Sequence, residues 1–412
     1  MRTTVVIVGA GQAGLAMSRI LTEDSIDHIV LERGTVANSW RTERWDSLRL
    51  LTPNWMTRLP GFQYSGPDPD GYMTADEVSA FLTSYRVGFS APVQEHTEVA
   101  SIETDGTDWI VITNNGIVTA KAVVLATGAC STPRIPAIGA ALPSSVRQLA
   151  PIHYRNPGHI DADQGVLVVG ASASGAQLAD ELARAGHDVT LAVGDHVRLP
   201  RTYRGMDIHW WLDTMGTLND RYDDVEDIVR ARRLPSLQLV GSDDRRDLGL
   251  NELSASGVTL AGRLAGVTDS ALQFSGSFAN AVASADLKQG RLLDAIDQWA
   301  TDNGLGREIG PIDRPQPTTV PDAPLARKLD DIGTVIWATG FKPHNPWLPE
   351  RLLDHKGAVI HDGGVTPEAG LYILGLPFLR HRNSSFIDGV GRDARYVGRH
   401  LRSHLDITTS VA

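Results

Sequence analysis

The chain contains two copies of one local pattern, and this pair constrains the fold more than any other feature. Each copy is a β-branched apolar run, a glycine turn, a helical segment and a second short apolar run. Strand, helix and strand in this order form the βαβ unit of a parallel sheet, so the sequence predicts an α/β fold. The copies are Val5–Val8, Gly9–Gly14, a helix to about Glu23 and His28–Leu31, then Val166–Val169, Gly170–Gly175, a helix to about Ala185 and Val189–Val193.

Further apolar runs indicate how the two units are nested. Residues 122–128 and 335–340 are buried-type strands that both end in Ala-Thr-Gly, and residues 371–374 form a last short strand. We expect the late strands to close the sheet of the first unit, so that the second unit is inserted into the first domain. The predicted domains are 1–160 with 327–412, and 161–326, the latter with a substrate or lid insertion around 205–255.

The first glycine turn, residues 9–14, matches GxGxxG between a strand and a helix, the setting that the pattern requires. Its glycines permit a tight turn, close approach of a pyrophosphate, and close packing of helix on strand. Glu32 ends the second strand, where a carboxylate can accept hydrogen bonds from ribose hydroxyls. A tight turn without a ligand is the alternative. The predicted dinucleotide-binding residues are Gly9, Gly11, Gln12, Ala13, Gly14, Glu32 and Arg33.

The second turn, residues 170–175, has Ser172 in place of the middle glycine. Serine is small, and its hydroxyl can donate to phosphate. No acid ends the next strand; Arg198, Arg201 and Arg204 follow it, and arginine there suits the 2′-phosphate of NADPH. Alternatively, these arginines form a solvated face or pair with Asp195 and Asp207. The predicted NADPH-binding residues are Gly170, Ser172, Ala173, Ser174, Arg198 and Arg201.

Composition narrows the function classes. The 412 residues carry a net charge of −11, so a nucleic-acid partner is not expected. No apolar run is long enough to span a membrane, and the N-terminus does not resemble a signal peptide, so we expect a cytoplasmic protein. Histidines are scattered and no metal site is predicted. The single cysteine, Cys130, cannot form the cysteine pair that disulfide reductases use.

Taken together, these segments resemble the flavin-containing monooxygenase family. The resemblance rests on the two dinucleotide turns, the strand ends at Ala126–Gly128 and Ala338–Phe341, and Tyr154–Pro157 ahead of the second unit. It covers nearly the whole chain and implies two Rossmann-like domains, with FAD at the first turn and NADPH at the second. One departure is clear: in the family fingerprint FxGxxxHxxx(Tyr/Trp), Ser144, Val146 and Ala150 replace Phe, Gly and His.

The resemblance also implies further site residues. Trp40 and Arg41 match a family position next to the flavin. Asn54 corresponds to an asparagine that faces the reactive flavin carbon, so it is the one predicted catalytic residue, although it can equally be a turn residue. The segments implied to close over FAD or to line the cofactors are Thr127, Gly128, Thr339, Gly340, Asp388, Gly389 and Val390.

Two adjacent dinucleotide sites allow hydride to pass from NADPH to FAD. With no cysteine pair to receive the electrons, dioxygen becomes the expected acceptor. The family chemistry then implies a C4a-(hydro)peroxyflavin that inserts one oxygen atom into a small organic substrate. A reductase, oxidase or electron-transfer flavoprotein, and a redox-sensing protein without turnover, remain alternatives. The sequence identifies neither the substrate nor the oligomeric state, although a homodimer is in keeping with this layout.

Overall fold

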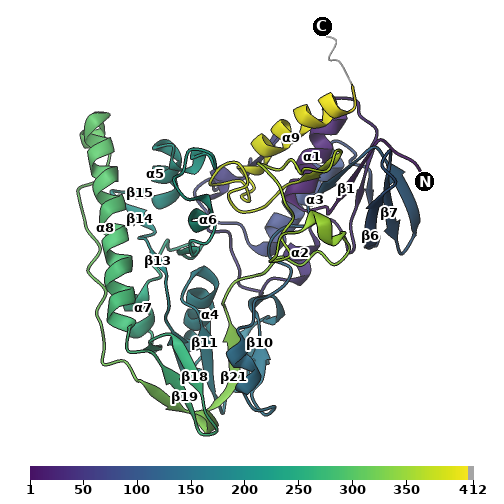
Figure 1. The fold of residues 1–412 in the computed structure, drawn as a ribbon. Helices are drawn as coiled ribbons and strands as arrows, with labels where there is room; N and C mark the ends of the chain where they lie inside the picture. The colour runs from purple at the N-terminus through teal and green to yellow at the C-terminus, as the bar shows by residue number, and fades with distance from the viewer. Residues whose placement is uncertain (407–412) are drawn as a thin grey trace.

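The computed structural model describes residues 1–406, and both predicted βαβ units are confirmed (Figure 1). They form two five-stranded sheets in which every neighbouring pair is parallel. The first sheet runs β22 (Leu371–Ile373), β9 (Ala122–Leu125), β1 (Val5–Val8), β2 (His28–Leu31) and β5 (Val93–Gln94). The second runs β10 (Arg147–Leu149), β21 (Ile332–Trp337), β11 (Gly165–Val169), β12 (Val189–Ala192) and β17 (Thr259–Ala261).

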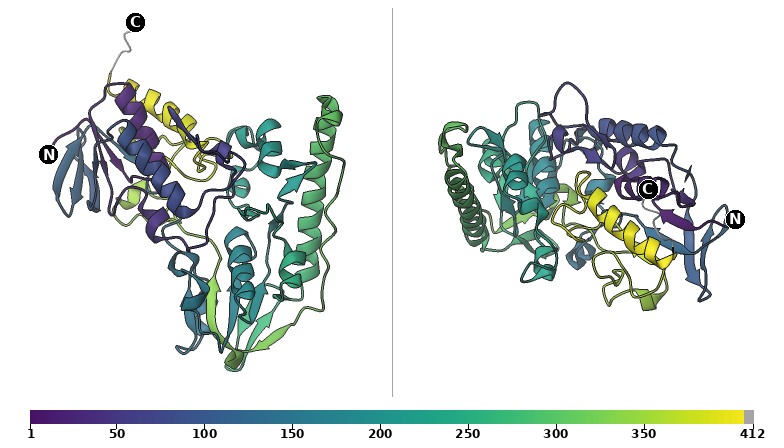
Figure 2. Two further views of the ribbon diagram at one scale, coloured as in Figure 1. Left: turned by 180° about the vertical axis from the view of Figure 1, so that it is seen from behind. Right: turned by 90° about the horizontal axis from the view of Figure 1, so that it is seen from above.

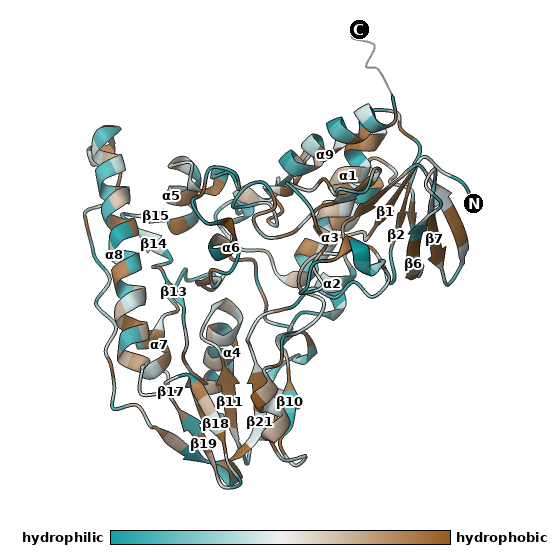
Figure 3. Cartoon of the chain, viewed as in Figure 1, coloured by the Kyte–Doolittle hydropathy of each residue, from teal (hydrophilic) through white to brown (hydrophobic). Residues whose placement is uncertain are grey.

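The central strands are buried along their whole length and mostly apolar, because both faces of a parallel sheet are covered. Every residue of β1, β9, β11 and β21 is buried, and β1 and β11 stand out as apolar ribbons in Figure 3. The covering helices are α1 (Gln12–Glu23), α3 (Ala75–Gly88) and α9 (Val390–His404) in the first unit, and α4 (Ala173–Arg184), α7 (Leu250–Ala255) and α8 (Phe278–Asp302) in the second.

Shorter elements complete the two units. A three-stranded antiparallel sheet, β6–β8, lies at the outer edge of the first unit, and α8 lies at the opposite outer edge of the molecule (Figure 2). The remaining helices are α2 (Asn38–Thr42), α5 (Ile208–Thr214) and α6 (Ile228–Ala231). The remaining strands are β3 (Arg58–Leu59), β4 (Phe62–Gln63), β6 (Val99–Thr104), β7 (Trp109–Thr113), β8 (Gly116–Ala120), β13 (Val197–Arg198), β14 (Thr202–Tyr203), β15 (Met206–Asp207), β16 (Leu237–Gln238), β18 (Leu264–Val267), β19 (Ala271–Phe274) and β20 (Ala326–Lys328).

The pairing of two strands differs from the sequence-based expectation. β21 does not close the first sheet; it lies between β10 and β11 in the second, with Val335 opposite Leu167. Only β22 returns to the first sheet, beside β9. A buried apolar strand is compatible with either parallel sheet, so the sequence of β21 does not indicate which strands it pairs with. The two-domain division stays a prediction. β10 and β21 lie within the stretches 1–160 and 327–412 expected for the first domain, yet they pair in the sheet of the second unit.

Residues 205–255 bridge the two units. Tyr222 donates its backbone N–H to the carbonyl of Arg380 (2.9 Å), and Arg382 donates its own to Asp220 (3.0 Å). Leu212 and Leu218 pack with Met56 in an apolar cluster that Phe386 also contacts. The insertion therefore covers the C-terminal loop that leads into α9. Within residues 1–406, no helix combines the length and apolarity needed to cross a bilayer.

Candidate functional site

The first glycine turn has two positions, Gly9 and Gly14, at which only glycine fits without strain or a steric clash. Gly9 has φ +106°, and a Cβ on Gly14 would lie 1.8 Å from the carbonyl oxygen of Gly9. A Cβ on Gly11, by contrast, would meet no atom within 4 Å. Gln12 and Ala13 open α1, whose N-cap residue Gly11 gives no side-chain cap. The first N–H groups of α1 thus face open space, the arrangement that binds a diphosphate at a helix N-terminus.

Glu32 is held rigidly at the mouth of this turn. Its carboxylate accepts hydrogen bonds from the N–H groups of Ala10 (2.8 Å) and Gly34 (3.0 Å), and the residue is 7% exposed. It therefore reaches the glycine turn as the predicted ribose contact requires. Arg33 points elsewhere, because its guanidinium pairs with Glu43 (2.5 Å) at the surface.

The second turn repeats the geometry of the first. Gly170 has φ +105°, and a Cβ on Gly175 would lie 1.8 Å from the carbonyl oxygen of Gly170. Ser172 is the N-cap residue of α4, but its side chain makes no cap hydrogen bond. Its hydroxyl therefore does not occupy the first N–H groups of α4. Ala173 and Ser174 begin that helix. The two turns are therefore equivalent cradles at the carboxyl ends of two parallel sheets.

The two Ala-Thr-Gly strand ends also take equivalent places. A Cβ on Gly9 would lie 2.6 Å from the carbonyl oxygen of Ala126, and one on Gly170 would lie 2.5 Å from that of Ala338. Past them, Gly128 (φ +75°) and Gly340 (φ +82°) would each accept a Cβ with nothing within 4 Å. Thr127 and Thr339 thus lie beside the glycine turns, and their contact with the cofactors stays a prediction.

The C-terminal loop meets the first turn from the other end of the chain. Gln12 donates to the carbonyl of Ser385 (3.3 Å), which joins residues 373 positions apart. Asp388 accepts from Arg58 (2.6 Å), and Gly389 and Val390 begin α9 directly after it. The N-terminus of α9 therefore lies in the same region as the first glycine turn.

Trp40 and Arg41 lie on α2, close to the same turn. The backbone N–H groups of both approach the carbonyl of Ala37, and Ala37 donates its own N–H to Ala10 in the turn (3.1 Å). The Arg41 guanidinium is bound to Thr83 (3.0 Å) and to a backbone carbonyl. The helix is thus anchored to the turn, while the Arg41 side chain is directed toward α3.

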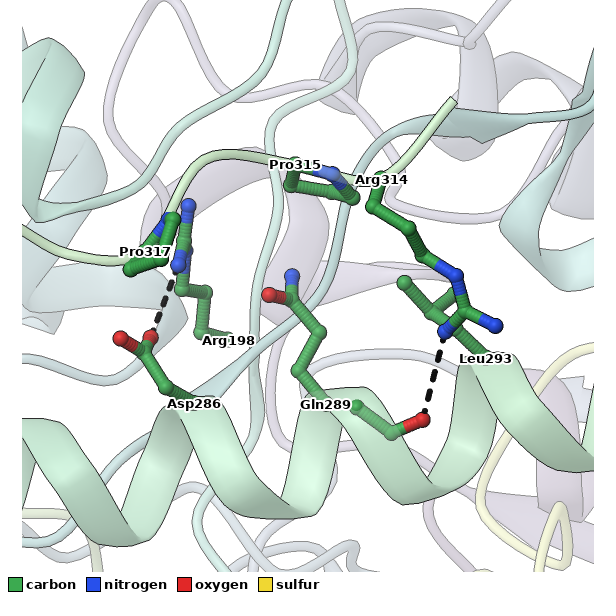
Figure 4. A pocket seen from close by; sticks show the side chains of 8 residues that line it. Arg198, Asp286, Gln289, Leu293, Arg314, Pro315 and Pro317 are labelled. Carbon is green, nitrogen blue, oxygen red and sulfur yellow. Dashed lines mark hydrogen bonds and ion pairs between the residues drawn. The ribbon is translucent and has the colours of Figure 1, made fainter. Parts of the chain in front are cut away.

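Arg198 and Arg201, predicted to bind the 2′-phosphate of NADPH, have internal partners instead. Arg201 is fully buried and pairs with Asp207 (2.6 Å). Arg198 pairs with Asp286 (2.8 Å) at a cavity of about 140 Å³ between α8 and residues 314–317, to which neither glycine turn contributes (Figure 4). Arg204 pairs with Asp297 (3.1 Å). The structure supports the alternative of pairing with aspartates, and confirms Asp207 as one partner. The expectation of Asp195 as the other partner was wrong, because it pairs with Arg263.

Asn54, the predicted catalytic residue, is buried and hydrogen-bonded to the backbone of a neighbouring loop. It is 6% exposed; its amide donates to the carbonyl of Asp68 (2.9 Å) and accepts from the N–H of Met73 (2.9 Å). These bonds tie together both ends of the loop between residues 54 and 73. The contacts favour the turn-residue alternative and give no support to a role at the flavin.

We expect Asn54→Ala to destabilise the fold by about 1–3 kcal/mol, because it leaves the buried N–H of Met73 without an acceptor. Urea denaturation measures this difference directly. An unchanged free energy of unfolding, together with increased hydrogen peroxide release, would instead restore the catalytic assignment.

A buried polar cluster joins the two units, and no sequence motif indicates it. Tyr72 from the first unit donates to Asp207 (2.6 Å), and Arg201 donates to the carbonyl of Leu51 (2.9 Å). Burial lowers the pKa of His209, so its ring is neutral and its Nδ1 accepts from Arg201 (3.0 Å). No local motif could reveal this cluster, because Tyr72 and Asp207 are 135 residues apart.

Two equivalent glycine cradles on two parallel sheets define a fold with two Rossmann-like, dinucleotide-binding-type units. The solved structure of a flavin-containing monooxygenase from Stenotrophomonas maltophilia has this fold, with TM-score 0.69 at 20% identity over 98% of this chain and 99% of its own. A bacillithiol disulfide reductase from Bacillus cereus is also similar, with TM-score 0.62 at 17% identity over 98% and 99% of the chains.

Sequence relatives narrow the class to a family. Residues 6–213 match the pyridine nucleotide-disulphide oxidoreductase family model, so the chain belongs to that family. It is 33% identical to an uncharacterized CzcO-like oxidoreductase of Geobacillus kaustophilus, over 97% of this chain and 98% of the relative. It is 31% identical to an indole-3-pyruvate monooxygenase, YUCCA4, of Oryza sativa, over 48% of this chain and 49% of the relative. The chain is therefore an oxidoreductase of this family.

Proposed function

We propose that the protein is an NADPH- and dioxygen-dependent FAD monooxygenase that transfers one oxygen atom to a small organic substrate. The observation that carries this proposal is the pair of equivalent cradles, one per sheet, each with a helix N-terminus that has no side-chain cap. The first cradle has Gly11 at the helix N-cap, and the second has the small residue Ser172 in the same place. The single cysteine supports dioxygen over a disulfide as the electron acceptor.

The residues present fit FAD at the first cradle. Gly11 and the N-terminus of α1 leave space and N–H donors for its diphosphate, and Glu32 lies where a ribose would be. Gly389 and Val390 direct the N-terminus of α9 into the same region, where the helix dipole favours negative charge. Bound at this cradle, FAD would supply a hydride acceptor for a nicotinamide and an electron donor for dioxygen.

The chain's own part is to position the cofactors and to keep water out. Met56, Leu212 and Leu218 form a buried apolar cluster between the units, with Phe386 from the C-terminal loop packed against it. Arg58 holds Asp388 at the start of α9, so this loop keeps its place. A dry, preorganised junction of this kind suppresses loss of reactive oxygen species to solvent.

A reductase or oxidase of the same fold is the second candidate, because the bacillithiol disulfide reductase shares the architecture. Cys130 is free and exposed, two residues beyond Gly128. It lies near the first cradle, yet a disulfide exchange within this chain would require a second thiol.

A spectroscopic experiment separates these candidates. The FAD-loaded protein is reduced with NADPH without oxygen and then mixed with oxygenated buffer. We expect a slowly decaying absorbance band at shorter wavelength than that of oxidised flavin, and oxygen transfer when amines, sulfides or ketones are supplied.

Two results would contradict the proposal. Immediate return of the oxidised spectrum with one hydrogen peroxide per NADPH would favour the oxidase. A purified protein that takes up no FAD would exclude both candidates.

A further inference from the structure

The two sheets have the same backbone register at their glycine turns. Gly9 donates its N–H to the carbonyl of Leu31 at the end of β2 (2.8 Å), and Gly170 donates to that of Ala192 at the end of β12 (3.0 Å). Leu31 and Ala192 therefore occupy corresponding positions. Any residue that contacts a nucleotide after Leu31 has a counterpart after Ala192.

The next residues also correspond, but their chemistry differs. Glu32 donates its N–H to the carbonyl of Gln94 (3.0 Å), and Val193 donates to that of Ala261 (2.9 Å). Val193 therefore takes the place of Glu32 in the second unit. It is apolar and 1% exposed, so it cannot accept a hydrogen bond from a ribose hydroxyl.

Two charged side chains flank this position from neighbouring strand ends. Asp195 follows β12 by three residues, and Arg263 follows β17 by two. They pair at 3.5 Å, and their side chains are 79% and 63% exposed, so the contact is weak. Gly194 lies between them in space: a Cβ there would come within 3.5 Å of the Arg263 Nε. Arg263 therefore lies over the backbone at the end of β12.

Arg263 is the arginine that remains available at this strand end in the described part of the chain. Arg198, Arg201 and Arg204 have side chains that are at most 10% exposed, and each pairs with an aspartate within 3.1 Å. Arg263 can instead exchange its loose contact with Asp195 for a phosphate, to which arginine binds with two parallel hydrogen bonds.

We propose that Arg263 and Asp195 together set the choice between NADPH and NADH, with Arg263 binding the 2′-phosphate and Asp195 opposing it by charge. This inference rests on the proposed function, since it assumes a nicotinamide nucleotide at the second cradle. The same position has no carboxylate equivalent to Glu32, so the free 2′-hydroxyl of NADH lacks the acceptor that the first cradle offers.

The test is a calorimetric titration of the FAD-loaded protein with NADP⁺, NAD⁺ and 2′,5′-ADP. We expect Arg263→Ala to raise the Kd for NADP⁺ and for 2′,5′-ADP about 10- to 100-fold, the loss of hydrogen bonds to a charged group. The Kd for NAD⁺ should change less than about threefold. Asp195→Asn should lower the Kd for NADP⁺, because it removes a repulsive carboxylate.

Arg291→Ala is the matched control, because it removes one exposed arginine from the same unit, on α8. It should leave all three Kd values unchanged. Equal changes for NADP⁺ and NAD⁺ in Arg263→Ala, or a native protein that prefers NAD⁺, would overturn the inference while leaving the monooxygenase proposal in place. Failure of the native protein to bind either nucleotide would contradict the proposed function itself.

Discussion

Replacing Gly14 with alanine should leave the protein without bound FAD and destabilise it by about 3 kcal/mol or more. The added Cβ would lie 1.8 Å from the carbonyl oxygen of Gly9 and 3.4 Å from the side chain of Ile7. Neither the turn nor β1 can move away, because both are held in the sheet. The helix must therefore separate from the strand, and the diphosphate cradle opens. Flavin content from the visible spectrum and urea denaturation measure the two effects.

Two controls separate the cradle from the fold. Gly88→Ala, at the end of α3, adds a Cβ that meets nothing within 4 Å and should preserve both flavin content and stability. Gly11→Ala also adds a Cβ into open space, at φ −82°, so the protein should fold normally yet bind FAD more weakly. If Gly11→Ala retained full FAD affinity, the diphosphate would not lie against this turn.

The sequence was sufficient to predict both cradles because their requirements are local. A few adjacent residues suffice to predict each cradle: a strand directly before Gly9 or Gly170 and a helix directly after the turn. The strand ends at 127–128 and 339–340 were found for the same reason, as two copies of one tripeptide. Which sheet each strand joins depends on partners far along the chain, so β21 was assigned to the wrong sheet.

Charged and polar residues were predicted less well, because their roles depend on distant partners. Arg198 has its carboxylate partner 88 residues away, and Arg201 contacts Leu51 from 150 residues away. A run of arginines after a strand looks the same in sequence whether it binds phosphate or aspartate. The role of Asn54 was also not predictable from the sequence, because its partner Met73 is 19 residues away and approaches it only in the folded chain.

Asp207→Asn should be the most destabilising change outside the cradles, at about 3–5 kcal/mol, because it leaves a buried guanidinium without its charge partner. Asp207 accepts hydrogen bonds from Arg201 (2.6 Å) and from Tyr72 (2.6 Å), so the variant also loosens the contact between the two units. Urea denaturation of the native and variant proteins at neutral pH measures the loss. Asp223→Asn is the control; its ion pair with Arg221 is exposed on both sides and should matter by less than about 1 kcal/mol.

The ion pair of Asp207 should also make the stability of the protein depend on pH in the acid range. Burial alone would raise the pKa of Asp207, but the hydrogen bonds that it accepts from the backbone N–H of His209 (2.8 Å) and from Tyr72, together with the charge of Arg201, outweigh it and hold the pKa at about 2, below its usual 3.8. A lowered folded-state pKa stabilises the fold above pH 3.8, and this stability is lost as the pH falls toward 2. The native protein should lose about 2 kcal/mol from this group across that interval, and Asp207→Asn should lack this component. Equal acid sensitivity in both proteins would mean that Asp207 is not ion-paired in solution.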